Sequence, residues 1–558
     1  MFRIIILFTG LLYFAFPFSG IAQFVLSGTI SDESSGETLP AATVVVMEIP
    51  GTGTISNSYG FYSLSLPEGE YQIRFQFVGY EPKTVEVQLN KNVHLNLELN
   101  RATYELGNVV VKGQRADRNV ASLEMGAVQL VPEQIESIPV IFGEQDLLKT
   151  LQLTPGVKPA GEGNSGFFVR GGGIDQNLIL LDEAPVYSAA HLLGFFSVFN
   201  SEAIKNVSLM KGFIPAEYGG RASSVLDIRM KEGNLKEYGV TGNLGLISSN
   251  ITIEGPLAQE KSSFILSGRR TYADIFLNFS GDEDVRNTHL FFYDLNLKTN
   301  HKINDRNRIY LSGYLGRDDF GYKNEFGFDW GSITGTLRWN HIFNDRLFSN
   351  TSLIFSNYSY DITILQNLDV AIRSEIKDIN LKQDFTFYPN PLNTMNFGVN
   401  VISHTIVPGE VTVNEAAGFI PPENISRRRA LEWAAYLSNS QRLTPDLSVY
   451  YGLRLSMFSN AGPGEFYEFN ENGELLKTIE TAKGKFFKTQ GGLEPRIALN
   501  YLLNSQSSVK ASYNRMYQFL HLLTNTTTTT PVDLWLPSSN NVKPQISEQV
   551  SLGWFRNF

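Results

Sequence analysis

Hydrophobic and polar residues alternate repeatedly from Glu237 to the end of the chain, in segments of about ten residues. Successive side chains of a β-strand point to opposite faces, so this pattern predicts strands with one apolar and one polar face. The clearest example sets Ile333, Gly335, Leu337 and Trp339 against Thr334, Thr336, Arg338 and Asn340, and residues 395–401 and 449–457 repeat it. In a soluble sandwich the apolar faces would meet in a core. In a transmembrane barrel they would face lipid, and the polar faces would line the lumen.

Several features favour the barrel over an array of soluble β-domains. Aromatic residues gather near the ends of the segments, the mean hydropathy is only −0.12, and no apolar run is long enough for a spanning helix. The polar connections at residues 462–485 and 525–531 would then be extracellular loops. We therefore predict an antiparallel transmembrane β-barrel.

Residues 24–100 also alternate, but over shorter runs separated by Gly- and Pro-containing turns. This arrangement predicts a small immunoglobulin-like β-sandwich. Its expected strands are Val25–Ile30, Ala42–Met47, Gly60–Leu66, Tyr71–Val78 and Val93–Leu99.

Residues 1–22 have the layout of a secretory signal peptide. Arg3 precedes an apolar run from Ile4 to Phe16, and the small residues Gly20 and Ala22 precede Gln23. A membrane anchor is the alternative, but the run is shorter than the roughly 20 residues that a spanning helix needs. The sequence therefore predicts an exported protein.

The stretch from Phe167 to Tyr187 joins a short extended run to an apolar strand through Gly171, Gly172 and Gly173. Glycines permit positive φ and close backbone approach, so they predict a tight corner here. Arg170 and Asp182 flank this corner in the sequence, and a buried pair between them would lock it. An ordinary Gly-rich hairpin with a surface ion pair is the alternative.

The segments around this stretch predict a mixed α/β unit. Residues 144–153 have helical periodicity, whereas residues 166–169 and 178–181 read as strands. Residues 203–211 and 224–230 read as further extended segments.

The string NLILLDEAPVY, with LTPGV before it, resembles the plug domain of TonB-dependent outer-membrane receptors. The motifs PAATVVV, SNSYGFYSLSLPEGEY and FQFVGYEPK resemble the carboxypeptidase regulatory-like domain that precedes the plug in receptors of the Bacteroidetes type. The strings GGLEPRIALNYLL and KASYNRMYQF resemble barrel strands of the same receptors. One departure is Asp182-Glu183, where the family more often has Asp-Gly.

The resemblance implies a receptor that takes up an unidentified ligand through a plugged barrel, driven by a TonB-type periplasmic energy-coupling protein. The alternative is a surface-binding or signalling receptor without transport. Outer-membrane lipid would surround the barrel, and the resemblance leaves room for a surface lipoprotein partner. The expected organisation is a signal peptide (1–22), the regulatory-like sandwich (23–100), a linker (101–119), the plug (120–235) and a partial barrel (236–558).

Val109, Val110 and Val111 form a β-branched run with flexible polar flanks inside this linker. Such a run can be the last strand of the sandwich, or a free segment that adds itself to the sheet edge of a partner. In the family that the chain resembles, the TonB box lies in this position. These three valines are therefore the candidate TonB box, and Arg170, Gly171, Gly172, Gly173 and Asp182 are the candidate structural residues of the plug.

The composition excludes several other classes of protein. The chain has no cysteine, so it has no disulfide framework and no thiolate metal site, and its net charge of −10 disfavours nucleic acid as a partner. Its seven histidines have no zinc-motif spacing. Residues 161–166 match GxGxxG by letter, but they open onto a strand and not onto a helix that could hold a pyrophosphate. We expect no enzyme activity, no cofactor and no metal.

The number of strands suggests an incomplete barrel. About thirteen strands can be counted after Glu237, whereas plugged transporters use about 22 and single-chain bacterial barrels use even numbers. Unpaired edges are not viable in lipid, so we expect further strands beyond Phe558. The aromatic last residue favours the alternative of a small closed barrel. Pairing between the strands near Val550 and Val240 distinguishes the two.

Overall fold

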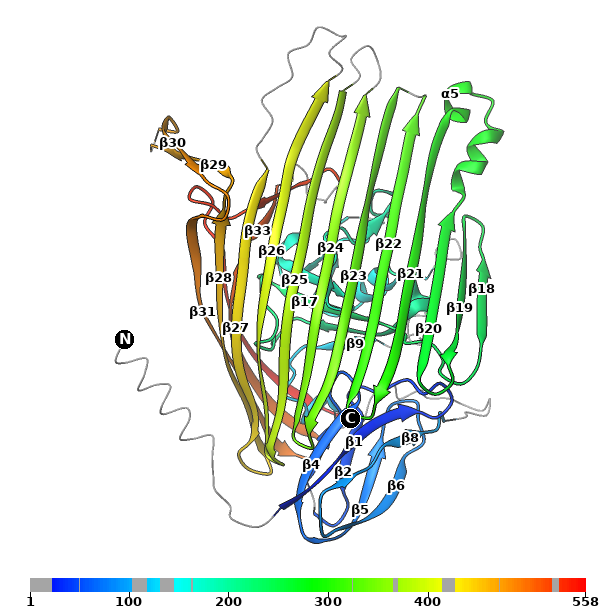
Figure 1. The fold of residues 1–558 in the computed structure, drawn as a ribbon, viewed down its shortest axis with the longest axis vertical. Coiled ribbons are helices and arrows are strands. Elements are labelled where there is room, and N and C mark those ends of the chain that lie inside the picture. The colour runs from blue at the N-terminus through cyan, green and yellow to red at the C-terminus, as the bar shows by residue number, and fades with distance from the viewer. Residues whose placement is uncertain are drawn as a thin grey trace.

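The computed structural model describes residues 23–49, 51–102, 118–130, 145–161, 164–323, 325–364, 370–413, 427–470, 472–523 and 531–557. The predicted signal peptide and the candidate TonB box at Val109–Val111 lie outside these residues. The described part is mainly β and consists of a small sandwich, a plug and one large curved sheet (Figure 1).

The N-terminal unit is the predicted sandwich of two sheets. One sheet contains β1 (Gln23–Asp32), β4 (Phe61–Pro67), β7 (Val93–His94) and β8 (Leu97–Leu99), and the other has the order β3 (Gly53–Ile55), β2 (Thr43–Val46), β5 (Gly69–Gln76) and β6 (Lys83–Leu89). Buried side chains from both sheets, among them Leu26, Val44 and Phe75, form its core. Strands β3 and β6 were not among the strands predicted from the sequence, because the turn signals did not delimit them.

The plug contains a five-stranded mixed sheet. Its order is β13 (Ala184–Pro185), β12 (Asn177–Leu181), β17 (Ser224–Met230), β16 (Ile204–Met210) and β9 (Val128–Leu130). Helix α4 (Leu147–Gln152) packs its buried leucines against this sheet, and the side chain of Asp146 caps it by accepting from the backbone of Lys149. The predicted α/β character of this unit is confirmed.

The large sheet is an antiparallel meander of 14 strands. In order these are β18 (Gly239–Leu244), β19 (Ser248–Ala258), β20 (Ser262–Thr271), β21 (Thr288–Asn304), β22 (Asn307–Tyr322), β23 (Phe326–Asn344), β24 (Leu347–Ile364), β25 (Val370–Asn390), β26 (Asn393–Val413), β27 (Arg428–Arg442), β28 (Leu447–Ala461), β31 (Phe486–Asn504), β32 (Ser507–Gln518) and β35 (Gln545–Arg556). Strand β20 and the strands that follow it curve around the plug (Figure 1).

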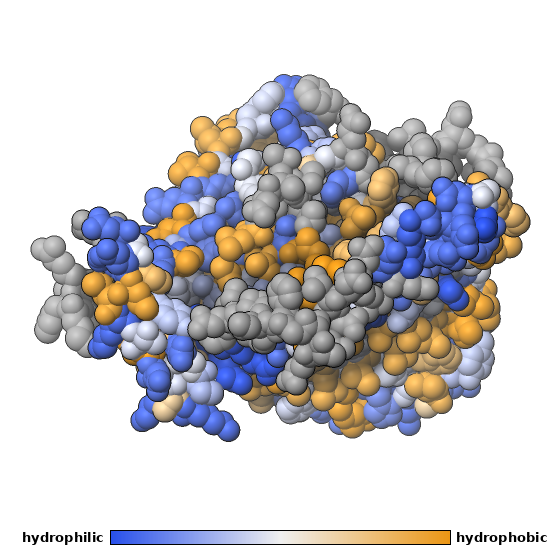
Figure 2. Space-filling view, turned by 90° about the horizontal axis from the view of Figure 1, so that it is seen from above, coloured by the Kyte–Doolittle hydropathy of each residue, from blue (hydrophilic) through white to orange (hydrophobic). Residues whose placement is uncertain are grey.

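The polarity of this sheet is inverted relative to that of a soluble protein. On β23 the apolar Ile333, Leu337 and Trp339 are 46%, 48% and 44% exposed, whereas Thr336 and Arg338 are 2% and 3% exposed. The polar face is therefore turned inward, toward the plug, and the apolar face outward. Apolar residues cover much of the outer wall at the lower right of Figure 2. This is the polarity of a lipid-facing barrel wall, and the interpretation as a soluble sandwich is wrong.

The connections differ at the two ends of the sheet. At one end the strands join through tight turns at residues 305–306, 345–346, 391–392 and 505–506. At the other end the connections are longer; residues 462–485 contain the hairpin of β29 (Gly464–Phe469) and β30 (Leu475–Thr481), and residues 519–544 contain that of β33 (Leu520–Leu523) and β34 (Leu534–Pro537). The sandwich lies below the short-turn end (Figure 1). Short periplasmic turns and long extracellular loops are the rule in outer-membrane barrels.

Strands β18 and β35 form the two ends of the sheet. Over the described ranges each pairs on one side only, so Val240 and Val550 remain 70% and 79% exposed and the sheet does not close on itself. Unpaired backbone groups are costly in lipid, so both edges need a pairing partner in a bilayer.

Among the described residues, no helix combines the length and apolarity needed to cross a membrane.

Candidate functional site

The candidate site is built around the two-residue turn Asp182-Glu183, which joins β12 to β13. Leu181 and Ala184 pair across the turn, and both turn residues have left-handed backbone, with φ of 46° and 76°. This geometry favours glycine at the second position, so a glutamate there is strained. Surrounding contacts must hold such a residue in place.

The carboxylate of Asp182 is buried against the barrel wall. Its partner is Lys298 on β21, whose ammonium nitrogen lies 3.0 Å from Oδ2, and the backbone N–H of Met230 donates to Oδ1 at 3.2 Å. Thr336 on β23 donates its hydroxyl hydrogen to the carbonyl oxygen of Asp182 at 2.9 Å. Burial alone would raise the pKa of Asp182, but Lys298 and Arg338 hold it below its ordinary value. The aspartate is thus a charged anchor between plug and wall.

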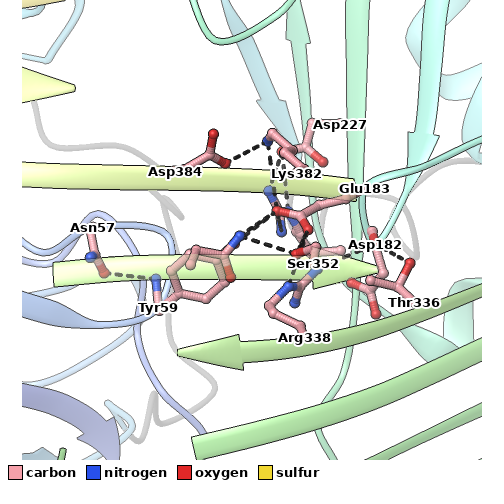
Figure 3. Close-up of polar contacts among 12 residues, drawn as sticks. Asn57, Tyr59, Asp182, Glu183, Asp227, Thr336, Arg338, Ser352, Lys382 and Asp384 are labelled. Carbon is pink, nitrogen blue, oxygen red and sulfur yellow. Dashed lines mark hydrogen bonds and ion pairs between the residues drawn. The ribbon is translucent and has the colours of Figure 1, made fainter. Parts of the chain in front are cut away.

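Glu183 extends the same contact to two further strands. Asn350 on β24 donates to Oε1 at 3.0 Å, Ser352 on β24 donates to Oε2, and the Nε of Arg338 lies 3.4 Å from Oε2. Lys382 on β25 lies 3.9 Å from Oε1 (Figure 3). Burial would raise the pKa of Glu183, but Arg338, Lys382 and Arg229 lower it. A single plug turn therefore binds three neighbouring barrel strands and β21.

The predicted buried pair between Arg170 and Asp182 is wrong. Arg170 is exposed and donates to the hydroxyl of Ser551 on β35 at 3.0 Å, whereas Asp182 pairs with Lys298. The reason is that β12 pairs in parallel with β17 and runs away from the corner. Its five residues carry Asp182 about 16 Å from the corner, at about 3.3 Å per residue.

The glycine corner itself is tight in the way the sequence predicts. Gly171 has a φ of +84°, and a Cβ at Gly172 would lie 2.4 Å from the Oγ of Ser223. Gly173 has an ordinary backbone, with φ −64°. Gly171 is therefore required by its backbone conformation, and Gly172 by the lack of space for a Cβ.

A second anchor of the plug is His191, which the sequence analysis treated as an ordinary histidine. Its Nε2 lies 2.7 Å from Asp294 on β21, and its Nδ1 lies 2.5 Å from Asp318 on β22. The ring stacks on Phe292 at 4.1 Å, and Arg269 also pairs with Asp294. Asp294 and Asp318 lie at buried positions of β21 and β22, and no spacing in the sequence could connect them with His191.

A third anchor holds the loop at residues 214–217 of the plug. Arg454 on β28 and Arg496 on β31 are buried, and they donate to backbone carbonyls of this loop, Arg454 to Glu217 at 3.2 Å and Arg496 to Ile214 at 3.1 Å. Glu494 pairs with Arg496 at 2.7 Å. Polar side chains of the wall thus bind the plug backbone directly.

A cavity of about 80 Å³ lies on the plug toward the long-loop end. Tyr187, Arg221, Tyr358 and Trp535 line it, together with Asp175 and Asp533. The guanidinium of Arg221 lies 5.8 Å and 5.1 Å from the ring centroids of Tyr187 and Trp535. A small-molecule site usually measures 300–1,000 Å³, so this cavity is smaller than such a site, and Leu522 of β33 and Trp535 of β34 contribute to its lining. No group of histidine, aspartate or glutamate side chains in the described part of the chain is arranged to hold a metal ion.

Three family models match the chain. The CarboxypepD_reg-like domain matches residues 26–111, the TonB-dependent receptor plug domain residues 125–225, and the TonB-dependent receptor-like β-barrel residues 260–555. The first match extends across Val109–Val111. A search of curated proteins gives no match.

Solved structures with the same fold include the copper transporter OprC, at 12% identity and a TM-score of 0.57, covering 77% of this chain and 71% of that one. A mutant of the ferric enterobactin receptor PfeA from Pseudomonas aeruginosa has 14% identity and a TM-score of 0.56 over 80% and 70% of the two chains. The ferric yersiniabactin uptake receptor FyuA from Yersinia pestis has 11% identity and a TM-score of 0.55 over 78% and 70%. With a plug anchored inside an outward-apolar sheet and a barrel model that matches more than half of its length, the chain belongs to the TonB-dependent receptor family.

Proposed function

We propose that this protein lies in the outer membrane and takes up its ligand through the barrel, with energy supplied by a TonB-type periplasmic protein. The observation that carries the proposal is the inverted polarity of the sheet around an anchored plug. An outward apolar wall suits lipid, and an inward polar wall binds the plug through charged and hydrogen-bonded contacts.

The ligand would enter from the long-loop end, where the cavity beside Arg221 and Trp535 lies. OprC is a copper transporter, PfeA is a ferric enterobactin receptor and FyuA is a ferric yersiniabactin uptake receptor. Uptake of a ligand from outside the cell is the activity proposed for this chain as well. The identity of the ligand depends on residues that line the lumen and the loops.

Val109–Val111 are proposed as the segment that binds the energy-coupling partner by strand addition. Their β-branched side chains suit a strand, and they precede the plug in the sequence. Force applied there would reach the plug through residues 118–130, where Asn500 on β31 donates to the backbone carbonyl of Val120 at 3.0 Å.

The test is deletion of Asn108–Lys112 in a cell that depends on this protein for uptake. Depletion of compounds from the growth medium, followed by mass spectrometry, should cease for the compounds that the intact protein removes, while the amount of folded protein at the surface stays unchanged. A receptor that binds without transport would show no depletion with either form. Loss of the folded sandwich on deletion would instead identify the run as a structural strand.

A further inference from the structure

The N-terminal sandwich inserts one side chain between the plug and the barrel wall. Tyr59, in the turn before β4, donates its hydroxyl hydrogen to Oε1 of Glu183 at 2.9 Å. Its ring stacks on Phe348 of β24, with centroids 5.4 Å apart. Figure 3 shows Tyr59 approaching the same cluster that contains Arg338 and Ser352. Sandwich, plug and barrel therefore meet at one residue.

Electrostatics favour this position for a tyrosine. The guanidinium groups of Arg338 and Arg229 lie 5.3 Å and 5.9 Å from its ring centroid, so the negative face of the ring meets cations while the hydroxyl meets the carboxylate. Burial and the charge of Glu183 raise the pKa of Tyr59, which keeps the hydroxyl protonated as a donor.

The sandwich contacts the rim at several other points. Phe61 stacks on Phe348 at 5.7 Å, and the hydroxyl of Ser27 donates to Asp345 in the turn between β23 and β24 at 2.9 Å. Thr38 donates to Glu232, which follows β17, at 3.0 Å. The sandwich is thus docked on the short-turn end of the barrel.

We propose that the docked sandwich is a latch, in which Tyr59 is a positioning residue that keeps the Asp182-Glu183 turn against the wall. The left-handed backbone of Glu183 is strained, so the turn depends on its side-chain partners, and Tyr59 is the one partner in Figure 3 that a movement of the sandwich alone would remove. Displacement of the sandwich would release this turn first. The role of that step in transport rests on the proposed function, whereas the latch itself does not.

The test is hydrogen exchange of the backbone amides of residues 177–186 in the full chain, in detergent micelles and without ligand or partner. Tyr59→Phe keeps the ring and removes the hydroxyl. It should accelerate exchange of this segment by at least about tenfold, the lower end of the effect expected for a hydrogen bond to a charged group. Tyr59→Ala should accelerate it further. Tyr71→Phe is the matched control, because the hydroxyl of Tyr71 donates within the sandwich, to the carbonyl of Pro67.

A double variant distinguishes a latch from general destabilisation. If Tyr59 acts through Glu183, then Tyr59→Phe should add no further acceleration in a Glu183→Ala background, which lacks the acceptor oxygen. The latch would be overturned if the effects of the two substitutions on exchange were fully additive. It would also be overturned if Tyr71→Phe accelerated exchange equally, or if exchange of residues 177–186 were unchanged in both Tyr59 variants. Because uptake is not measured, failure of the transport proposal would leave this result unaffected.

Discussion

Asp182 in the plug and Lys298 on β21 form a buried ion pair with an N–O distance of 3.0 Å. The two residues are 1% and 3% exposed. The same lysine donates to the carbonyl oxygen of Met230 at 2.8 Å, so it binds the ends of two adjacent plug strands. This pair joins the barrel wall to the plug turn that Tyr59 of the proposed latch also contacts.

Lys298→Met should loosen the plug strongly. Removal of one partner of a buried pair typically costs about 3–5 kcal/mol, because the other charge remains buried. The free energy of opening, measured by hydrogen exchange of residues 177–186 and 224–230, should fall by that amount. Lys302→Met is the control, since Lys302 pairs with Asp305 at the surface, where a pair is worth about 0–1 kcal/mol. Equal small effects of both variants would show that the Asp182 pair does not hold the plug.

Arg170→Ala should have little effect on plug stability. Its side chain is exposed and donates to the hydroxyl of Ser551, so we expect a loss of no more than about 1 kcal/mol. Unfolding of the plug in urea, followed in the full chain, measures the change. A loss of about 3 kcal/mol or more would place Arg170 in a buried network that the structure does not show.

Gly172→Ala and Gly173→Ala should differ, although the two glycines are adjacent. A Cβ at position 172 would lie 2.4 Å and 2.6 Å from the Oγ and Cβ of Ser223, and overpacking of this kind costs about 1–3 kcal/mol. At position 173 the nearest atom is the Oδ1 of Asp175, the mobile end of a side chain, at 2.8 Å. Urea unfolding should show the larger loss for Gly172→Ala; the reverse order would contradict the geometry of the corner.

The plug should become less stable as the pH rises toward 9. Burial alone would lower the pKa of His191, but Asp294 and Asp318 raise it to about 9. A pKa raised in the folded state gives stability that is complete below the ordinary pKa of 6.5 and is lost as the pH rises through 9. The expected loss is about 3 kcal/mol, from 1.36 kcal/mol per pKa unit.

Hydrogen exchange of residues 189–198, corrected for the intrinsic effect of pH, measures this dependence. His191→Gln should abolish it, whereas His289→Gln should retain it, because the His289–Asp319 pair is half exposed. A pH dependence that survives in His191→Gln would assign it to another group.

The alternation along each strand was enough to predict the barrel wall, because period-two polarity is a local property. Ile333 and Leu337 face outward and Arg338 inward, as the pattern around residue 335 indicates. The anchors of the plug were not predictable in this way. Asp182 and Lys298 are 116 residues apart, and which inward lysine meets which turn depends on how the plug sits in the barrel.

Arg170 and Asp182 do not pair, although they flank the glycine corner in the sequence. Proximity in the sequence suggested a pair across the glycine corner, but that reasoning assumes a hairpin, and β12 instead pairs in parallel with β17. Glu183 was noted as a departure from the Asp-Gly pattern of the family. Its partners on β24 explain how a glutamate is held there in spite of the left-handed backbone.

The central claim, that a TonB-type protein drives this receptor through Val109–Val111, is tested most directly by photo-crosslinking in cells. A photoreactive phenylalanine analogue at position 110 should form a covalent adduct with the periplasmic energy-coupling protein, identified by mass spectrometry. The same group at Val87, which is buried in the sandwich at 7% exposure, should form adducts only within the chain. If position 110 gives only adducts with sandwich strands and none with a periplasmic partner, the run is structural and this coupling mechanism is contradicted.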